Sequence, residues 1–138
     1  MSTATATHTG TSSNSLAILI GRVLLSIMFI VAGFGKLTAI GATAGWFGSI
    51  GLPVPTVTAV VVGLVELVGG LAILVGYQTR IAALVLAVFT VAATLIAHTN
   101  LADQVQQLFF LKNLAITGGF LALAAGGAGA YSIDARRA

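Results

Sequence analysis

Four ionisable side chains lie in or beside long apolar stretches of this sequence, and their types could do chemistry. Glu66 stands at the centre of the run VVVGLVELVGGLAILV, and three others stand in or beside separate apolar runs: Arg22, His98 and Lys112. An ionisable side chain inside a membrane is expensive, so it pairs with another charge, binds a ligand or moves a proton. Which of these applies depends first on whether the runs are membrane helices.

The composition is that of an integral membrane protein. The chain has 138 residues, of which 58% are hydrophobic and 7% are charged, whereas a soluble domain carries about 25% charged residues. There is no cysteine, which excludes disulfides, thiol nucleophiles and thiolate metal sites. The sequence contains no nucleotide-binding loop, metal-ligand set or catalytic motif, and its basic residues are too scattered for nucleic-acid binding. We therefore expect no autonomous enzyme, no catalytic residue, no metal and no nucleic-acid partner.

Four segments reach the roughly 20 apolar residues that a helix needs to cross a bilayer. They cover about 16–37, 56–75, 81–98 and 108–128. Glycine is frequent within them, as in membrane helices whose backbones approach closely, and none has the polar stripe of a soluble bundle. The predicted fold class is an all-α membrane protein, a bundle of four transmembrane helices. We assign 1–15 as a flexible Thr/Ser-rich tail, 16–134 as the transmembrane domain and 135–138 as a short C-terminal tail.

The segment between the first two spans, TAIGATAGWFGSIGLPVPT, is predicted to be a loop. Pro53 and Pro55 lack the amide hydrogen needed inside a helix, so they should end the loop just before the second span. Trp46 and Phe47 suit the headgroup layer, where amphipathic rings are stable. We interpret the segment as a loop that lies on the membrane rather than as a lid over a site.

Four spans place both ends of the chain on one side of the membrane. Arg80, Arg136 and Arg137 would lie on that side, and Lys36 on the opposite side. The excess of basic residues on cytoplasmic loops therefore predicts cytoplasmic termini. We interpret these four residues as structural and topological anchors.

We predict that Arg22 and Glu66 form an ion pair in the bundle interior. At about 1.5 Å of rise per residue their depths differ by roughly 4–5 Å, and a forked guanidinium suits a carboxylate. Lys112 lies roughly 9 Å further outward than Glu66 by the same rise. The pair either fixes the register of two helices or lines a polar cavity, and both interpretations stay open. The candidate ligand-binding or buried ion cluster is Arg22, Glu66, Lys112, Asn113 and His98.

Several stretches of the sequence resemble one known family. They are GRVLLSIMFIVAGFGKL, then GLP, then ELVGGLAILVGYQTRIAA, and finally FFLKNLAITGGFLALAAGGAGAYSID. In content and order they are similar to the DoxX family of small four-span bacterial membrane proteins, over about 21–134. The resemblance implies a location in the bacterial inner membrane, and it marks the positions Arg22, Glu66, Thr79–Arg80 and Lys112–Asn113.

The resemblance also implies a link to quinone-dependent oxidoreductase complexes and to redox or thiol stress. The leading hypothesis is therefore a membrane subunit of a redox, respiratory or oxidative-stress-related complex, whose buried cluster holds a quinone-type or other polar ligand. The expected partners are the lipid bilayer, other membrane or redox proteins, and further copies of the chain. Two alternatives stay open: a purely structural assembly subunit and a small proton-coupled transporter. The transporter is less favoured, because cations beside Glu66 would hinder proton exchange.

Overall fold

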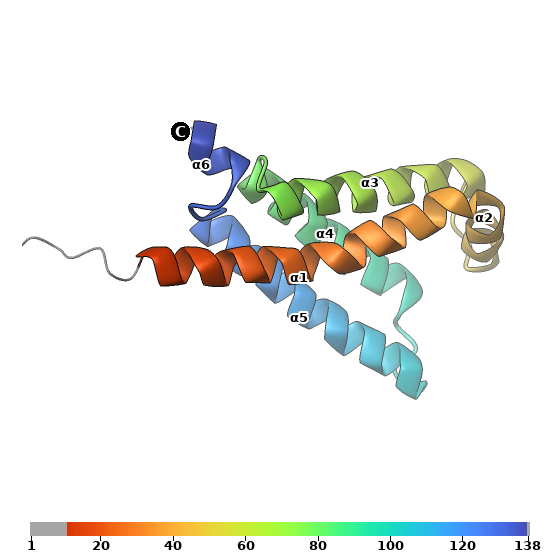
Figure 1. Ribbon diagram of the computed structural model, residues 1–138. Helices are drawn as coiled ribbons and strands as arrows, with labels where there is room; N and C mark the ends of the chain where they lie inside the picture. Colours follow the sequence, from red (N-terminus) through yellow and green to blue (C-terminus); the bar gives the residue numbers. More distant parts are fainter. Residues whose placement is uncertain (1–10, 138) are drawn as a thin grey trace, which may run out of the picture.

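A computed structural model describes residues 11–137. It contains six helices in the order α1 (Thr11–Thr38), α2 (Ile40–Ser49), α3 (Pro55–Val75), α4 (Thr79–Ala97), α5 (Gln104–Gly126) and α6 (Ile133–Arg137), and the described residues contain no strand (Figure 1). Four of these helices, α1, α3, α4 and α5, are long and apolar enough to cross a membrane. The predicted fold class, a bundle of four transmembrane helices, is confirmed.

Local sequence signals explain where the spanning helices begin and end. Pro55 occupies the first turn of α3, where its missing N–H is not needed. Gly76 ends the same helix with φ +70, a left-handed conformation that favours glycine. Asp103 caps α5 by accepting a hydrogen bond from the N–H of Val105. Helix α1 begins at Thr11, so residues 11–15 of the predicted tail are helical, whereas 1–10 lie outside the described residues.

The bundle consists of two helix pairs that diverge at one end. Helix α1 packs along α3, and α4 packs along α5 (Figure 1). The pairs meet at the terminal end, which holds α6 and the turn 76–78. At the loop end, which holds α2 and residues 98–103, the start of α5 swings away from α1 (Figure 1). The short helix α2 lies across the ends of α1 and α3 and packs mainly on α3.

The contact between α1 and α3 is a backbone contact made through glycines. A Cβ atom at Gly33 would lie 2.5 Å from the Leu67 nitrogen and 2.7 Å from the Gly63 oxygen. A Cβ atom at Gly70 would lie 3.0 Å from the Ile30 nitrogen. Such close approach is the usual role of small residues in membrane helices. These contacts fix the register of the antiparallel pair, with Gly33 opposite 63–67.

Arg22 holds the terminal end of the bundle together. Its side chain is 1% exposed, and Nε donates to the Ile73 oxygen at 2.9 Å while Nη2 donates to the Leu74 oxygen at 2.7 Å. Nη1 donates to the oxygens of Ala128 and Tyr131 at 2.9 and 2.7 Å. The last carbonyls of a helix have no partner within it, so the guanidinium caps α3. It thereby connects α1, α3 and the segment that follows α5.

The predicted ion pair between Arg22 and Glu66 is wrong. Gly33 lies opposite 63–67, which includes Glu66, and Arg22 stands eleven residues before Gly33 in the antiparallel helix. At the α-helical rise this is a separation of about 16 Å along the bundle. The prediction measured depth from the ends of the apolar runs, whereas the glycine contacts set the register. The end of α3 also offers carbonyls that need donors.

The C-terminal helix α6 is fixed to the turn between α3 and α4. The Asp134 carboxylate accepts hydrogen bonds from the N–H groups of Gln78 and Thr79, at 2.7 and 2.8 Å, where a helix N-terminus favours an anion. Burial by itself raises the pKa of Asp134, but these hydrogen bonds and Arg137 outweigh it, so the pKa lies below its ordinary value. The Asp134 N–H donates to the Gly76 oxygen at 2.8 Å. The predicted C-terminal tail therefore begins inside an anchored helix.

We expect Gly33→Ala to lower the free energy of unfolding by about 1–3 kcal/mol, the usual effect of forcing extra volume into a packed contact. The new methyl group would meet the backbone of α3, which cannot rotate away, so the helices must separate. Gly35→Ala is the matched control, because a Cβ atom there meets nothing within 4 Å. Thermal unfolding of both variants in one detergent measures the difference. Equal stabilities would contradict the close contact.

We expect Arg22→Leu to lower the free energy of unfolding by at least about 3 kcal/mol, because hydrogen bonds to a charged group contribute about 1.5–3 kcal/mol each. Arg80→Leu is the control: Arg80 is exposed and donates one bond, at 3.1 Å, to the Ala125 oxygen at the end of α5. Because water solvates the exposed head group of Arg80, loss of this bond should cost only about 1 kcal/mol or less, as for exposed charged interactions. Denaturation by increasing SDS in mixed micelles compares the two. A similar loss in both would show that Arg22 does not hold the terminal end.

Candidate functional site

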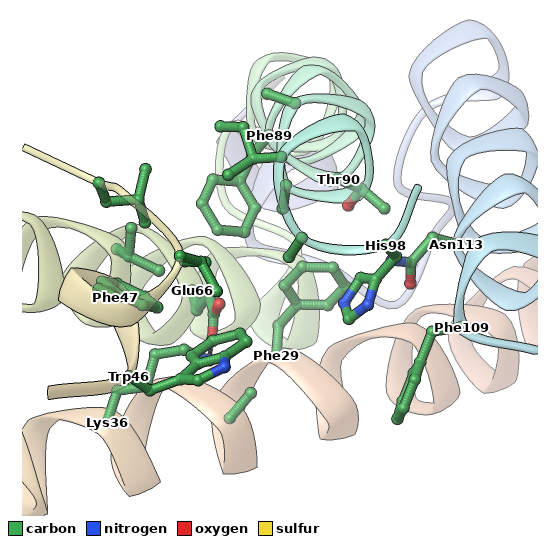
Figure 2. Close-up of a pocket in the computed structure, with 18 of the residues that line it drawn as sticks. Phe29, Lys36, Trp46, Phe47, Glu66, Phe89, Thr90, His98, Phe109 and Asn113 are labelled. Atoms are coloured by element: carbon green, nitrogen blue, oxygen red, sulfur yellow. Dashed lines mark hydrogen bonds and ion pairs between the residues drawn. The ribbon is translucent and has the colours of Figure 1, made fainter. Parts of the chain in front are cut away.

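The divergence of the helix pairs leaves a cavity of about 510 Å³ toward the loop end. This volume lies within the range of small-molecule sites, about 300–1,000 Å³. Residues of all five longer helices line it, and Figure 2 shows aromatic rings around a few polar groups. Apolar and aromatic side chains make up most of the wall. Its charged and strongly polar side chains are Lys36, Glu66, His98, Lys112 and Asn113.

Aromatic packing closes the cavity toward the terminal end. The rings of Phe29 and Phe120 meet edge to face with their centroids 5.2 Å apart. Both side chains are buried in the core, and Phe29 also lines the cavity. The residues that line the cavity lie on the loop-end side of this contact, where α1 and α5 separate (Figure 1).

Glu66 is paired with Lys36 rather than with Arg22. Nζ of Lys36 lies 3.0 Å from Oε2 of Glu66, and the two side chains are 23% and 8% exposed. Lys36 stands three residues after Gly33 and so faces the same part of α3. Lys36 was expected to be a structural and topological anchor, and its pairing with Glu66 was not predicted from the sequence. Setting Gly33 against Gly63 and Gly70 would have placed Lys36 beside Glu66.

A second set of polar side chains lies on the cavity wall opposite the Lys36–Glu66 pair (Figure 2). The rings of His98 and Phe109 stack with centroids 5.0 Å apart, and Nζ of Lys112 lies 4.4 Å from the centroid of the same phenyl ring. Burial first, and Lys112 second, lower the pKa of His98, so its imidazole is neutral at neutral pH. Its Nδ1 is buried and has no hydrogen-bond partner in the described part of the chain. The Asn113 amide donates to Oγ1 of Thr94 at 2.9 Å.

The structure brings together four of the five residues of the predicted cluster. Glu66, His98, Lys112 and Asn113 line the cavity, whereas Arg22 lies at the terminal end and does not. Within residues 11–137, no group of three or more His, Asp or Glu side chains could hold a metal ion.

The segment that was interpreted as a loop on the membrane instead covers the cavity. It forms the helix α2, and both of its aromatic residues, Trp46 and Phe47, line the site (Figure 2). Phe47 is 4% exposed, and the rings of Trp46 and Phe47 lie 5.3 Å apart. Trp46 remains half exposed. The sequence did not reveal this role: α2 contains three glycines, which have low helix propensity, so local sequence gives no helix signal there.

Four helices that are long and apolar enough to cross a membrane, around a mainly apolar cavity with a few polar side chains in its wall, define a small multi-span membrane protein. The chain belongs to the DoxX family, whose sequence profile matches residues 17–99. The resemblance noted in the sequence is thereby confirmed. The cavity wall that α5 contributes lies beyond the matched segment.

Curated relatives support the family assignment. The chain is 45% identical over 119 residues to "Inner membrane protein YqjF" of Escherichia coli strain K12, covering 86% of this chain and 90% of that protein. It is 31% identical over 130 residues to "Inner membrane protein YphA" of the same strain, covering 91% and 93%. It is 36% identical over 81 residues to "Putative oxidoreductase CatD" of Bacillus subtilis strain 168, covering 59% of each chain. No solved structure matches the chain.

We expect the two halves of the Lys36–Glu66 pair to respond unequally to neutralisation. Lys36→Met leaves the more deeply buried carboxylate without its counter-charge, and should cost about 3 kcal/mol of unfolding free energy, near the value for breaking buried pairs. Glu66→Gln should cost less, because Lys36 is partly exposed and can extend toward the headgroups. The double variant should recover most of the loss. SDS denaturation measures all three, and strictly additive losses would contradict the pairing.

Proposed function

We propose that this protein is an inner-membrane subunit of a redox assembly and that its cavity binds the ring of a quinone-type ligand. The observation that carries this proposal is the composition of the cavity wall. Aromatic and aliphatic side chains surround it, while amine and amide donors stand at two of its edges, on Lys36, Lys112 and Asn113. A quinone ring has apolar faces and carbonyl acceptors on its edge, so it matches this arrangement.

The comparisons support the location and, more weakly, the chemistry. Two relatives that align over most of the chain are named as inner membrane proteins, and a third, more partial relative is named as an oxidoreductase. The chain has no cysteine and no cofactor motif of its own. A bound quinone would therefore supply the electron-carrying group, and a partner protein would supply the second redox centre. The side chains of this protein would bind and orient the ring and exclude water from it.

The predicted orientation, with both termini in the cytoplasm, belongs to the same proposal. Arg22, Arg80, Arg136 and Arg137 lie at the terminal end, and Lys36 and Lys112 lie toward the loop end. This distribution of basic residues supports a cytoplasmic location of the terminal end by the positive-inside rule. In that orientation the cavity would lie toward the outer half of the bilayer.

We expect a short-tailed ubiquinone analogue to quench the fluorescence of Trp46 in a saturable way. Trp46 is the sole tryptophan of the chain and lines the cavity, so its emission responds to a ligand bound there. Ala93→Phe, which places a ring in the cavity wall, should abolish the quenching. Ala115→Phe is the matched control, because Ala115 is exposed on α5 and does not line the cavity. Titration of the three purified proteins in detergent decides between these outcomes.

Absence of saturable quenching, or equal quenching in both variants, would contradict quinone binding in the cavity. Mass spectrometry of the complex purified under mild conditions gives an independent measurement. A redox partner together with a co-purified quinone supports the proposal. A partner protein without any quinone would favour the structural assembly subunit instead.

A further inference from the structure

Each acidic side chain of the sequence has a partner other than Lys112, one of the two lysines that line the cavity. The sequence contains three acidic residues. Glu66 pairs with Lys36, Asp103 accepts the Val105 N–H at the start of α5, and Asp134 caps α4. Lys112, which lines the cavity, forms no ion pair with any of them within residues 11–137. The phenyl ring of Phe109, 4.4 Å from its Nζ, is the contact the ammonium makes there.

The cavity wall therefore carries a net positive charge. Lys36 and Lys112 contribute two positive charges, Glu66 contributes one negative charge, and the described lining holds no other carboxylate. His98 adds no charge near neutral pH, since burial and Lys112 lower its pKa. Lys112 is exposed, and a cation in a largely apolar wall is stabilised by a partner of opposite sign. No carboxylate within residues 11–137 pairs with Lys112, so an anionic ligand can take that place.

We propose that the cavity selects an amphiphile whose polar head is a negatively charged oxygen, a carboxylate or an ionised ring hydroxyl, held by Lys112. This inference rests on the proposed function, since it uses the same cavity, and it specifies the charge of the ligand. The head lies between Lys112, His98 and Asn113. The apolar body lies against the rings of Phe29 and Phe89.

Two further features of the site fit an anionic head. Nδ1 of His98 is a buried polar atom without a partner in the described chain, and such atoms commonly meet a water or ligand. Asn113 is oriented by its bond to Thr94, whose own hydroxyl donates to the Thr90 oxygen at 2.7 Å. The lysine of the site thus stands beside polar groups that packing and hydrogen bonds already hold in place. Pre-organisation of this kind favours binding.

The cavity also has room for the body of an amphiphile to leave toward lipid. Trp46, Ile50 and Ile96 line the cavity and are also exposed on the outer surface of the bundle. All three lie near the loop end, on α2, directly after it, and on α4. A chain or ring substituent can therefore extend between these elements while the head stays beside Lys112.

The test compares ligands that share a body and differ in the charge of the head. The alkyl series is decanoate, decanol and decylamine, and the ring series is butylbenzoate, butylbenzyl alcohol and butylbenzylamine. Each is titrated into the full chain in phosphatidylcholine nanodiscs, with the emission of Trp46 as the signal. Each acid should bind about tenfold or more tightly than its alcohol, as expected for a charge-assisted bond, and the amines should bind more weakly still.

Two variants assign the preference to Lys112. Lys112→Met should lower the affinity for both acids by about tenfold and leave the alcohols unchanged. Arg136→Met is the matched control, since it removes one cation at the terminal end, on α6, away from the cavity. It should keep the preference for acids. The comparison of the two acids tells whether the site takes an alkyl carboxylate or a ring-borne anion.

The proposal is overturned if the alcohols bind as tightly as the acids, or if Lys112→Met keeps the full preference. If Lys112→Met does not fold, the head-group series on the unmodified protein still decides. If the quinone does not quench Trp46 but the acids still bind, the proposal of quinone binding is wrong and the proposal of a site for an anionic head group stands. If the acids and the alcohols bind equally tightly while the quinone quenches Trp46 as expected, the charge preference is wrong and quinone binding stands.

Discussion

The capping of α3 by the guanidinium of Arg22 is the interaction on which the rest of the structure depends. A buried cation in an apolar bundle needs acceptors, and a helix end needs donors. Arg22 satisfies both needs at once, since its four hydrogen bonds go to carbonyls of α3 and of the segment after α5. Three parts of the chain are thereby held at the terminal end. The helices can then diverge at the loop end, and this divergence creates the cavity.

The hydrogen-bond acceptors that Arg22 uses decide which acidic residues remain available to the cavity wall. A guanidinium is a planar fork with several donors, so it can serve a group of neutral carbonyls, whereas an ammonium is a point charge. Because Arg22 takes carbonyls, it uses none of the three acids of the chain. Glu66 stays available to pair with Lys36 in the cavity wall. Carbonyl oxygens stabilise the buried charge of Arg22 at the terminal end, and a separate ion pair with Lys36 stabilises the buried charge of Glu66 in the cavity wall.

The sequence predicts the spans and most of the polar side chains of the cavity wall, because both follow from local rules. The length of the apolar runs predicts the four spanning helices, and the expectation that polar groups face inward selects Glu66, His98, Lys112 and Asn113. The partners of the charges cannot be obtained in this way, since they depend on helix register. The contact of Gly33 with the backbone of α3 sets that register, and hydropathy does not report it. Nor does composition predict α2, a ten-residue helix with three glycines that is stabilised by packing on α3.

The four carbonyls that accept hydrogen bonds from Arg22 are synthesised at two different stages. Arg22 enters the membrane with the first spanning helix, and the acceptors on Ile73 and Leu74 follow with the second. Those of Ala128 and Tyr131 emerge only after the last spanning helix has been made. Until then the nascent chain holds a cation with half of its final acceptors. The segment that follows α5 therefore completes the solvation of a charge carried by α1, and this couples the synthesis of that segment to the locking of the bundle.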